Sequence, residues 1–149
     1  MESLLVAGRR PVVAKGPFLT PGCGRLEGVD RTGVADWIAG YERAWRAVGT
    51  APLAELFTDD ARYLQGPYRE PVVGLPAIAR MWQAEREGPD EVFTMRHEIV
   101  AVDGDVAVAR VEVRYGPPSG DEYRDLWIMR FAGDNRCRSF EEWPFAPPG

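Results

Sequence analysis

Residues able to carry out acid–base chemistry stand in the segment Val106 to Tyr115, where charged and apolar side chains alternate. In a strand this period of two puts Arg110, Glu112 and Arg114 on one face and an apolar row on the other, namely Ala107, Ala109, Val111, Val113 and Tyr115. The pattern alone favours a buried apolar row and a solvated charged row, because ionised side chains are seldom buried unless paired. The chemistry of this strand depends on which face looks inward.

Inside a partly dry cavity, one arginine between two carboxylates would act on them in opposite ways. Attraction to the guanidinium would keep at least one carboxylate ionised, whereas burial and mutual repulsion would favour protonation of the other. Two glutamates could in that way supply an acid and a base. Alternatively, the same residues form a structural Arg–Glu network without turnover.

Other reactive residue types give weaker signals. His97 is the only histidine and has no cysteine or second histidine nearby in sequence to complete a metal site, so we expect no metal and no cofactor. Cys23 and Cys137 are far apart and belong to no CxxC pair, which indicates two free thiols. The Asp59–Asp60 pair is better explained by a turn than by metal binding.

The composition is typical of a folded domain and excludes some partners. The 149 residues are 45% apolar and 11% aromatic, with a net charge of −5. Nucleic-acid binding needs clustered basic residues, and none are present. The only early apolar run, Leu4 to Ala7, is too short for a signal peptide or a membrane span, so we expect a cytoplasmic protein.

The order of predicted elements indicates an α+β fold. Residues 1–33 are rich in Pro and Gly and read as an irregular extension before a domain at 34–149. Apolar spacing predicts a helix from Val34 to Val48, a short helix after Pro52, and a third introduced by Gly74 and Pro76. A strand at Ala61–Gln65 precedes that third helix. Four strands complete the chain: Phe93–Val102, Val106–Tyr115, Glu122–Phe131 and Arg136–Trp143. Three helices should therefore pack on one side of an antiparallel sheet.

This order of elements, with Leu56-Phe57-Thr58-Asp59-Asp60-Ala61 after the first helices and Arg130-Phe131 before the last turn, resembles the nuclear transport factor two-like superfamily. SnoaL-like polyketide cyclases, ketosteroid isomerase and limonene epoxide hydrolase belong to it. The resemblance implies a cone-shaped pocket between a curved sheet and the helices. It also implies a homodimer through the outer sheet face, with the apolar row from Ala107 to Tyr115 turned toward the partner.

Ketosteroid isomerase matches only in part. Its oxyanion-hole tyrosine falls on Tyr41, but its general base falls on Gln65 and its protonated acid on Trp127. An amide cannot abstract a proton, so this correspondence argues against that activity.

Limonene epoxide hydrolase resembles the chain at five polar positions. Its arginine and first aspartate correspond to Arg110 and Glu112, and its second aspartate to Glu142. Its water-holding tyrosine and asparagine correspond to Tyr63 and Gln65. The resemblance implies that Glu142 deprotonates a water, Glu112 protonates a leaving oxygen and Arg110 bridges both. The side chains of Glu112, Glu142 and Gln65 are each one methylene longer than their counterparts in that enzyme. The extra length would shift the acid and the base away from the productive geometry.

The candidate pocket wall is mostly apolar and suits a small apolar molecule. Besides the polar set, it comprises Tyr41, Trp45, Phe57, Met81, Trp82, Arg114, Asp125, Trp127, Met129 and Phe140. Two functions follow from these observations: an acid–base enzyme of the epoxide hydrolase, cyclase or isomerase type, or a non-catalytic ligand-binding or dimerisation module.

Overall fold

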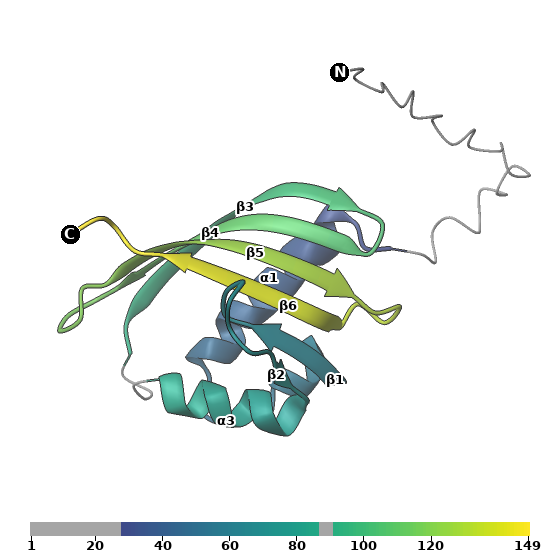
Figure 1. Ribbon diagram of the computed structural model, residues 1–149, viewed down its shortest axis with the longest axis horizontal. Coiled ribbons are helices and arrows are strands. Elements are labelled where there is room, and N and C mark those ends of the chain that lie inside the picture. The colour runs from purple at the N-terminus through teal and green to yellow at the C-terminus, as the bar shows by residue number, and fades with distance from the viewer. Residues whose placement is uncertain (1–27, 87–90) are drawn as a thin grey trace, which may run out of the picture.

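The computed structural model describes residues 28–86 and 91–149, which form one curved sheet covered by helices on one side (Figure 1). The elements are α1 (Arg31–Arg46), α2 (Leu53–Leu56), β1 (Phe57–Leu64), β2 (Val72–Val73), α3 (Leu75–Glu85), β3 (Phe93–Asp103), β4 (Val106–Tyr115), β5 (Glu122–Phe131) and β6 (Cys137–Phe145). The predicted α+β class and the helix-covered curved sheet are confirmed. Helix α1 begins at Arg31, three residues before the predicted start, and residues 1–27 of the predicted extension lie outside the described chain.

The sheet order is β2-β1-β6-β5-β4-β3. Strands β3 to β6 form the expected antiparallel meander, because tight turns join each to the next. Strand β1 then adds to β6 in parallel, with Tyr63 beside Phe140. This parallel pair was not expected from the sequence. It places β1 and β6, the first and last strands in chain order, side by side.

Local sequence explains where the helices begin and end. Asp30 caps α1, since its side chain accepts a hydrogen bond from the Gly33 N–H at 2.7 Å. Gly74 precedes α3 with φ of +89°, a conformation that glycine adopts without steric cost, and Pro76 occupies the first turn. No described helix is both long and apolar enough to cross a membrane.

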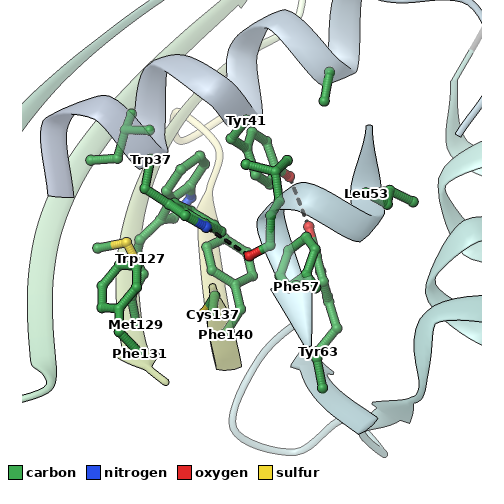
Figure 2. Packing of buried hydrophobic residues seen from close by; sticks show 14 of the residues in the cluster. Trp37, Tyr41, Leu53, Phe57, Tyr63, Trp127, Met129, Phe131, Cys137 and Phe140 are labelled. Carbon is green, nitrogen blue, oxygen red and sulfur yellow. Dashed lines mark hydrogen bonds between the residues drawn. The ribbon is translucent and has the colours of Figure 1, made fainter. Parts of the chain in front are cut away.

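Trp37 of α1 is the centre of the core. Its ring lies within 5.5–6.4 Å of the rings of Tyr41, Phe57, Trp127, Phe131 and Phe140. Its Nε1 donates to the Leu56 carbonyl at 2.8 Å, which ties α1 to the end of α2 (Figure 2). A buried indole that has both its packing and its hydrogen bond satisfied is a strong anchor for a helix on a sheet.

Strand β4 buries its apolar face against this core. Ala107, Ala109 and Val111 are fully buried, whereas Arg110 and Arg114 are exposed on the other side. The expectation that the apolar row turns toward a dimer partner is therefore wrong. Burial of this row is favourable because α1 and the aromatic side chains of β5 offer it an apolar surface.

Replacement of Trp37 by alanine should lower the free energy of unfolding by about 3–5 kcal/mol, because it removes a large buried ring and leaves the Leu56 carbonyl without its donor. Urea titration followed by circular dichroism measures the loss. Tyr68→Ala, at a fully exposed aromatic residue, is the control and should change stability by less than about 0.5 kcal/mol. Equal effects of the two substitutions would contradict the central role of Trp37.

Candidate functional site

The inner sheet face presents two carboxyl groups on neighbouring strands. Trp127 pairs with Glu142 and Asp125 pairs with Pro144 between β5 and β6, so Asp125, Trp127 and Glu142 share the face that looks toward α1. Both carboxyl groups line a cavity of about 540 Å³. Tyr41 and Trp45 of α1 and Tyr63 and Gln65 from the β1 side complete its inner part.

Three oxygens meet at the inner end of the cavity. The Tyr41 and Tyr63 hydroxyls are 2.8 Å apart, and the Tyr63 hydroxyl lies 2.8 Å from Glu142 Oε2. The contact from the Tyr41 hydroxyl to the same Oε2 is longer, at 3.3 Å. Figure 2 shows the two tyrosine hydroxyls pointing toward each other from α1 and β1.

The number of available protons determines which of these three oxygens donate hydrogen bonds. The two hydroxyls carry one proton each, so an ionised Glu142 leaves two protons for three contacts. The distances then fit a chain in which Tyr41 donates to Tyr63 and Tyr63 donates to Glu142, with the 3.3 Å contact left as the weakest. Protonation of Glu142 would supply a third proton. The triangle can thus accept or release one proton with little rearrangement.

Burial sets the protonation states in this cluster. Desolvation raises the pKa of Glu142 to about 7, with a smaller upward contribution from the Asp125 charge, while the hydrogen bond from Tyr63 opposes the shift. Desolvation, followed by the charge of Glu142, also raises the pKa of both Tyr41 and Tyr63 well above 10. The tyrosines therefore stay protonated as donors, and Glu142 exchanges a proton near neutral pH.

Asp125 is the second inner carboxyl group. Its Oδ2 accepts a hydrogen bond of 3.3 Å from Trp127 Nε1, while Oδ1 is buried and has no partner in the described chain. Desolvation raises the pKa of this carboxyl, which favours its neutral form. Two carboxyl groups thus line one cavity, and only that of Glu142 is held by tyrosines.

The predicted charged triad does not assemble. Arg110 lies on the outer face with its side chain 67% exposed, 3.6 Å from Glu98. Glu112 pairs with Arg96 and Arg124 on that face, and Arg114 pairs with Glu122. The inward placement of Arg110, Glu112 and Arg114 was therefore wrong, because the sheet cannot bury both faces of β4 and buries the apolar one.

The structure brings some of the predicted wall residues to one cavity. Tyr41, Trp45, Asp125 and Trp127 line the cavity with Tyr63, Gln65 and Glu142. Other predicted wall residues lie in the core or against it and do not line the cavity: Phe57, Met81, Trp82, Met129 and Phe140. Gln65 does not take part in the Glu142 triangle but donates to Glu85 at 2.6 Å.

Several lining residues were missed. Phe93, Tyr115 and Tyr123 form the outer part of the wall, with acidic residues among them: Glu85, Glu91 and Asp121. Tyr115 and Tyr123 could have been found, since each continues the inward row of its strand. Among the described residues, no group of three or more His, Cys, Asp or Glu side chains is placed to hold a metal ion.

Comparison with known families gives a match over most of the chain. The sequence model of the SnoaL-like domain matches residues 27–138. The chain belongs to the SnoaL-like family. Comparison with curated proteins gives no match.

Solved structures share the fold of this SnoaL-like chain. SalBIII, an epoxide hydrolase/cyclase-like enzyme in pyran ring formation in salinomycin, has a TM-score of 0.64 at 13% identity, covering 78% of this chain and 93% of its own. An LEH-like epoxide hydrolase of M. tuberculosis has a TM-score of 0.60 at 13% identity, with 76% and 79% covered. A Sinorhizobium meliloti protein assigned as a polyketide cyclase has a TM-score of 0.56 at 26% identity, with 72% and 93% covered.

The raised pKa of Glu142 makes the stability of this SnoaL-like chain depend on pH. Its carboxyl binds a proton more tightly when folded (about 7) than at the ordinary value of 4.5, so its stabilising contribution is complete below about pH 4.5 and is lost as pH rises through 7. Relative to Glu142→Gln, wild type should lose roughly 3 kcal/mol between these limits, at about 1.4 kcal/mol per pKa unit.

Urea unfolding of both proteins from pH 4 to 9 measures this difference. Glu141→Gln, the same change on the outer face of the same strand, is the matched control and should follow wild type. A wild-type to Glu142→Gln difference that stays constant with pH would contradict the burial of the Glu142 carboxyl.

Proposed function

We propose that this SnoaL-like protein is an enzyme that moves a proton on a small, mostly apolar molecule, in a reaction of the isomerase or cyclase type. Glu142 acts as the base that removes the proton and returns it. One observation carries the proposal: the Glu142 carboxyl is enclosed in an aromatic cavity at the end of a Tyr41–Tyr63 hydrogen-bond chain. A carboxyl with a pKa near 7 is well matched to proton transfer at neutral pH.

The geometry suits removal of a proton from a carbon beside a carbonyl group. Tyr63 holds Oε2, and no group in the described chain hydrogen-bonds Oε1 of Glu142, which leaves that oxygen for the substrate. As the carbon loses its proton to Glu142, the carbonyl oxygen gains negative charge. The Tyr115 hydroxyl lines the cavity and can donate a hydrogen bond to that oxygen, because burial raises the pKa of Tyr115 well above its ordinary value and keeps it protonated. Return of the proton from Glu142 to a different carbon completes an isomerisation.

The hydrolytic mechanism that the resemblance implied has less support. It requires an arginine that bridges two carboxyl groups, and Arg110 lies on the opposite face of the sheet from Glu142. The sequence argues against ketosteroid isomerase chemistry, because Gln65 stands at the position of that enzyme's general base. Glu142 offers a carboxylate from another strand, so that objection does not apply to proton transfer by Glu142.

Deuterium exchange tests the proposal. The purified protein is incubated in D₂O with a panel of apolar ketones that have acidic α-carbons, and incorporation is followed by mass spectrometry. Wild type should catalyse exchange, and Glu142→Gln should reduce the rate by about 10²–10⁴-fold, because an amide cannot accept the proton. Tyr63→Phe should cause a smaller loss by raising the pKa of Glu142.

The outer-face variant Glu141→Gln should retain exchange at the wild-type rate. Exchange that persists in Glu142→Gln would overturn the assignment of the base. Ketones that bind to wild type without any exchange would identify the protein as the alternative, a non-catalytic ligand-binding module. Hydrolysis of epoxides that depends on Glu142 would favour the hydrolase chemistry instead.

We further propose a homodimer through the outer sheet face. Half-buried apolar side chains meet at its centre, where Val108 pairs with Ile128 and Leu126 pairs with Trp143. The surrounding arginines and glutamates already neutralise one another within the chain, so a second copy meets little unpaired charge. A neutral apolar centre with a polar rim is typical of a protein interface.

Light scattering after size exclusion should give a dimer at micromolar concentration, and Ile128→Arg should convert it to a monomer, since the interface centre cannot solvate the new charge. Val48→Arg, at an exposed position after α1, is the control and should remain dimeric. A monomeric wild type would contradict this interface.

A further inference from the structure

The charges that line the cavity are all of one sign. Five acidic residues contribute to its wall: Glu85, Glu91, Asp121, Asp125 and Glu142. Among its lining residues in the described chain there is no lysine, arginine or histidine. A concave site lined by one sign of charge with low-dielectric walls concentrates ligands of the opposite sign.

Acidic residues on the outer sheet face are in a different situation. There Glu98, Glu112 and Glu122 each lie within 4 Å of an arginine. Three carboxyl groups of the cavity accept hydrogen bonds from neutral donors: tyrosine hydroxyls for Glu142, the Trp127 indole for Asp125, and the Gln65 amide for Glu85. The three outer carboxylates have counter-charges supplied by the chain, whereas Asp125 and Glu142 leave that role open to a ligand.

Seven aromatic residues also line the cavity: Tyr41, Trp45, Tyr63, Phe93, Tyr115, Tyr123 and Trp127. Tyr41 and Trp127 lie 4.6 Å apart by ring centroids at the inner end. Toward the outer end, Tyr115 contacts Phe93 at 5.9 Å and Tyr123 at 6.3 Å. The negative face of an aromatic ring attracts a cation, most strongly where water is excluded, and a wall of such rings also buries an apolar body.

Two arginines lie behind this wall but do not line the cavity. The guanidinium of Arg46 is 3.9 Å from the Phe93 ring centroid, pairs with Glu42 and donates to the Phe93 carbonyl. Arg86 donates to backbone carbonyls after α1, those of Ala47 and Gly49. Both cations are held by these partners, so neither is free to neutralise Asp125 or Glu142.

We propose that the ligand of this cavity carries a positively charged nitrogen, an ammonium or iminium group, on an apolar body. The inference rests on the same cavity as the proposed function and names its substrate class. A cationic substrate also assists the chemistry, because its charge offsets the negative charge that develops on the substrate when Glu142 removes a proton. Anionic substrates, such as carboxylates and phosphates, are disfavoured by the same carboxyl groups.

Three probes of similar shape separate charge from size. Phenyltrimethylammonium and tert-butylbenzene differ by exchange of N⁺ for carbon, and benzenesulfonate carries the opposite charge. Binding to the full chain is measured at pH 8 and low salt by calorimetry and by quenching of tryptophan fluorescence, since Trp45 and Trp127 line the cavity. The cation should bind roughly tenfold or more tightly than its neutral isostere, and the anion should bind most weakly.

Matched variants test which carboxyl groups cause the preference for the cation. Asp125→Asn with Glu142→Gln should weaken binding of the cation by about tenfold and leave tert-butylbenzene within about twofold. Glu141→Gln, which removes one charge from the outer face of the same strand, should leave both affinities unchanged. Circular dichroism confirms that the variants are folded, and binding of the neutral probe shows that the cavity is intact.

Equal binding of the cation and its isostere, preference for the anion, or a cation preference that survives the double substitution would overturn the inference. So would the absence of cation binding even in the millimolar range. These failures are distinct from failure of the proposed function, because Glu142-dependent deuterium exchange on neutral ketones would persist without any cation preference.

Discussion

Strand β4 can bury only one of its faces, and the rest of the molecule is arranged around that constraint. Its inner row begins with two alanines, which leave space for the indoles of Trp37 and Trp127 against the sheet. The opposite row of arginines and glutamates then stays in solvent and forms ion pairs across the strands. The centre of the inner face is filled by rings and small side chains, and the carboxyl groups of Asp125 and Glu142 lie toward the end of the sheet that lines the cavity.

At that end of the sheet, two opposing effects set the pKa of the Glu142 carboxyl. Loss of solvation favours the neutral acid, whereas the Tyr63 hydroxyl favours the carboxylate. Loss of solvation is the larger of the two effects, and it raises the pKa to about 7. A nearby guanidinium would shift this balance strongly toward the ionised form, and none of the described residues that line the cavity is an arginine.

The fold could be predicted from the sequence in most of its parts. Helix spacing around Trp37 and Tyr41, turn residues between strands and strict alternation in Val106–Tyr115 identified nearly every element, because each of these signals is local. The same alternation correctly favoured an outer Arg110 row, whereas the inward placement of that row, which the resemblance to limonene epoxide hydrolase implied, was wrong. Sequence order could not show that Glu142 meets Tyr41 and Tyr63, since that contact depends on the parallel pairing of β1 with β6, which no local pattern encodes.

The parallel pairing of β1 with β6 has a consequence for the kinetics of folding. Tyr63 and Glu142 are separated by 79 positions, whereas the meander of β3 to β6 pairs strands that are consecutive in the chain. Closing so long a loop costs entropy before any contact repays it, which makes this step a natural late event in folding. The Glu142 carboxyl would then remain solvated, with an ordinary acidity, in any partly folded chain, and its raised pKa would appear only when β1 and β6 pair.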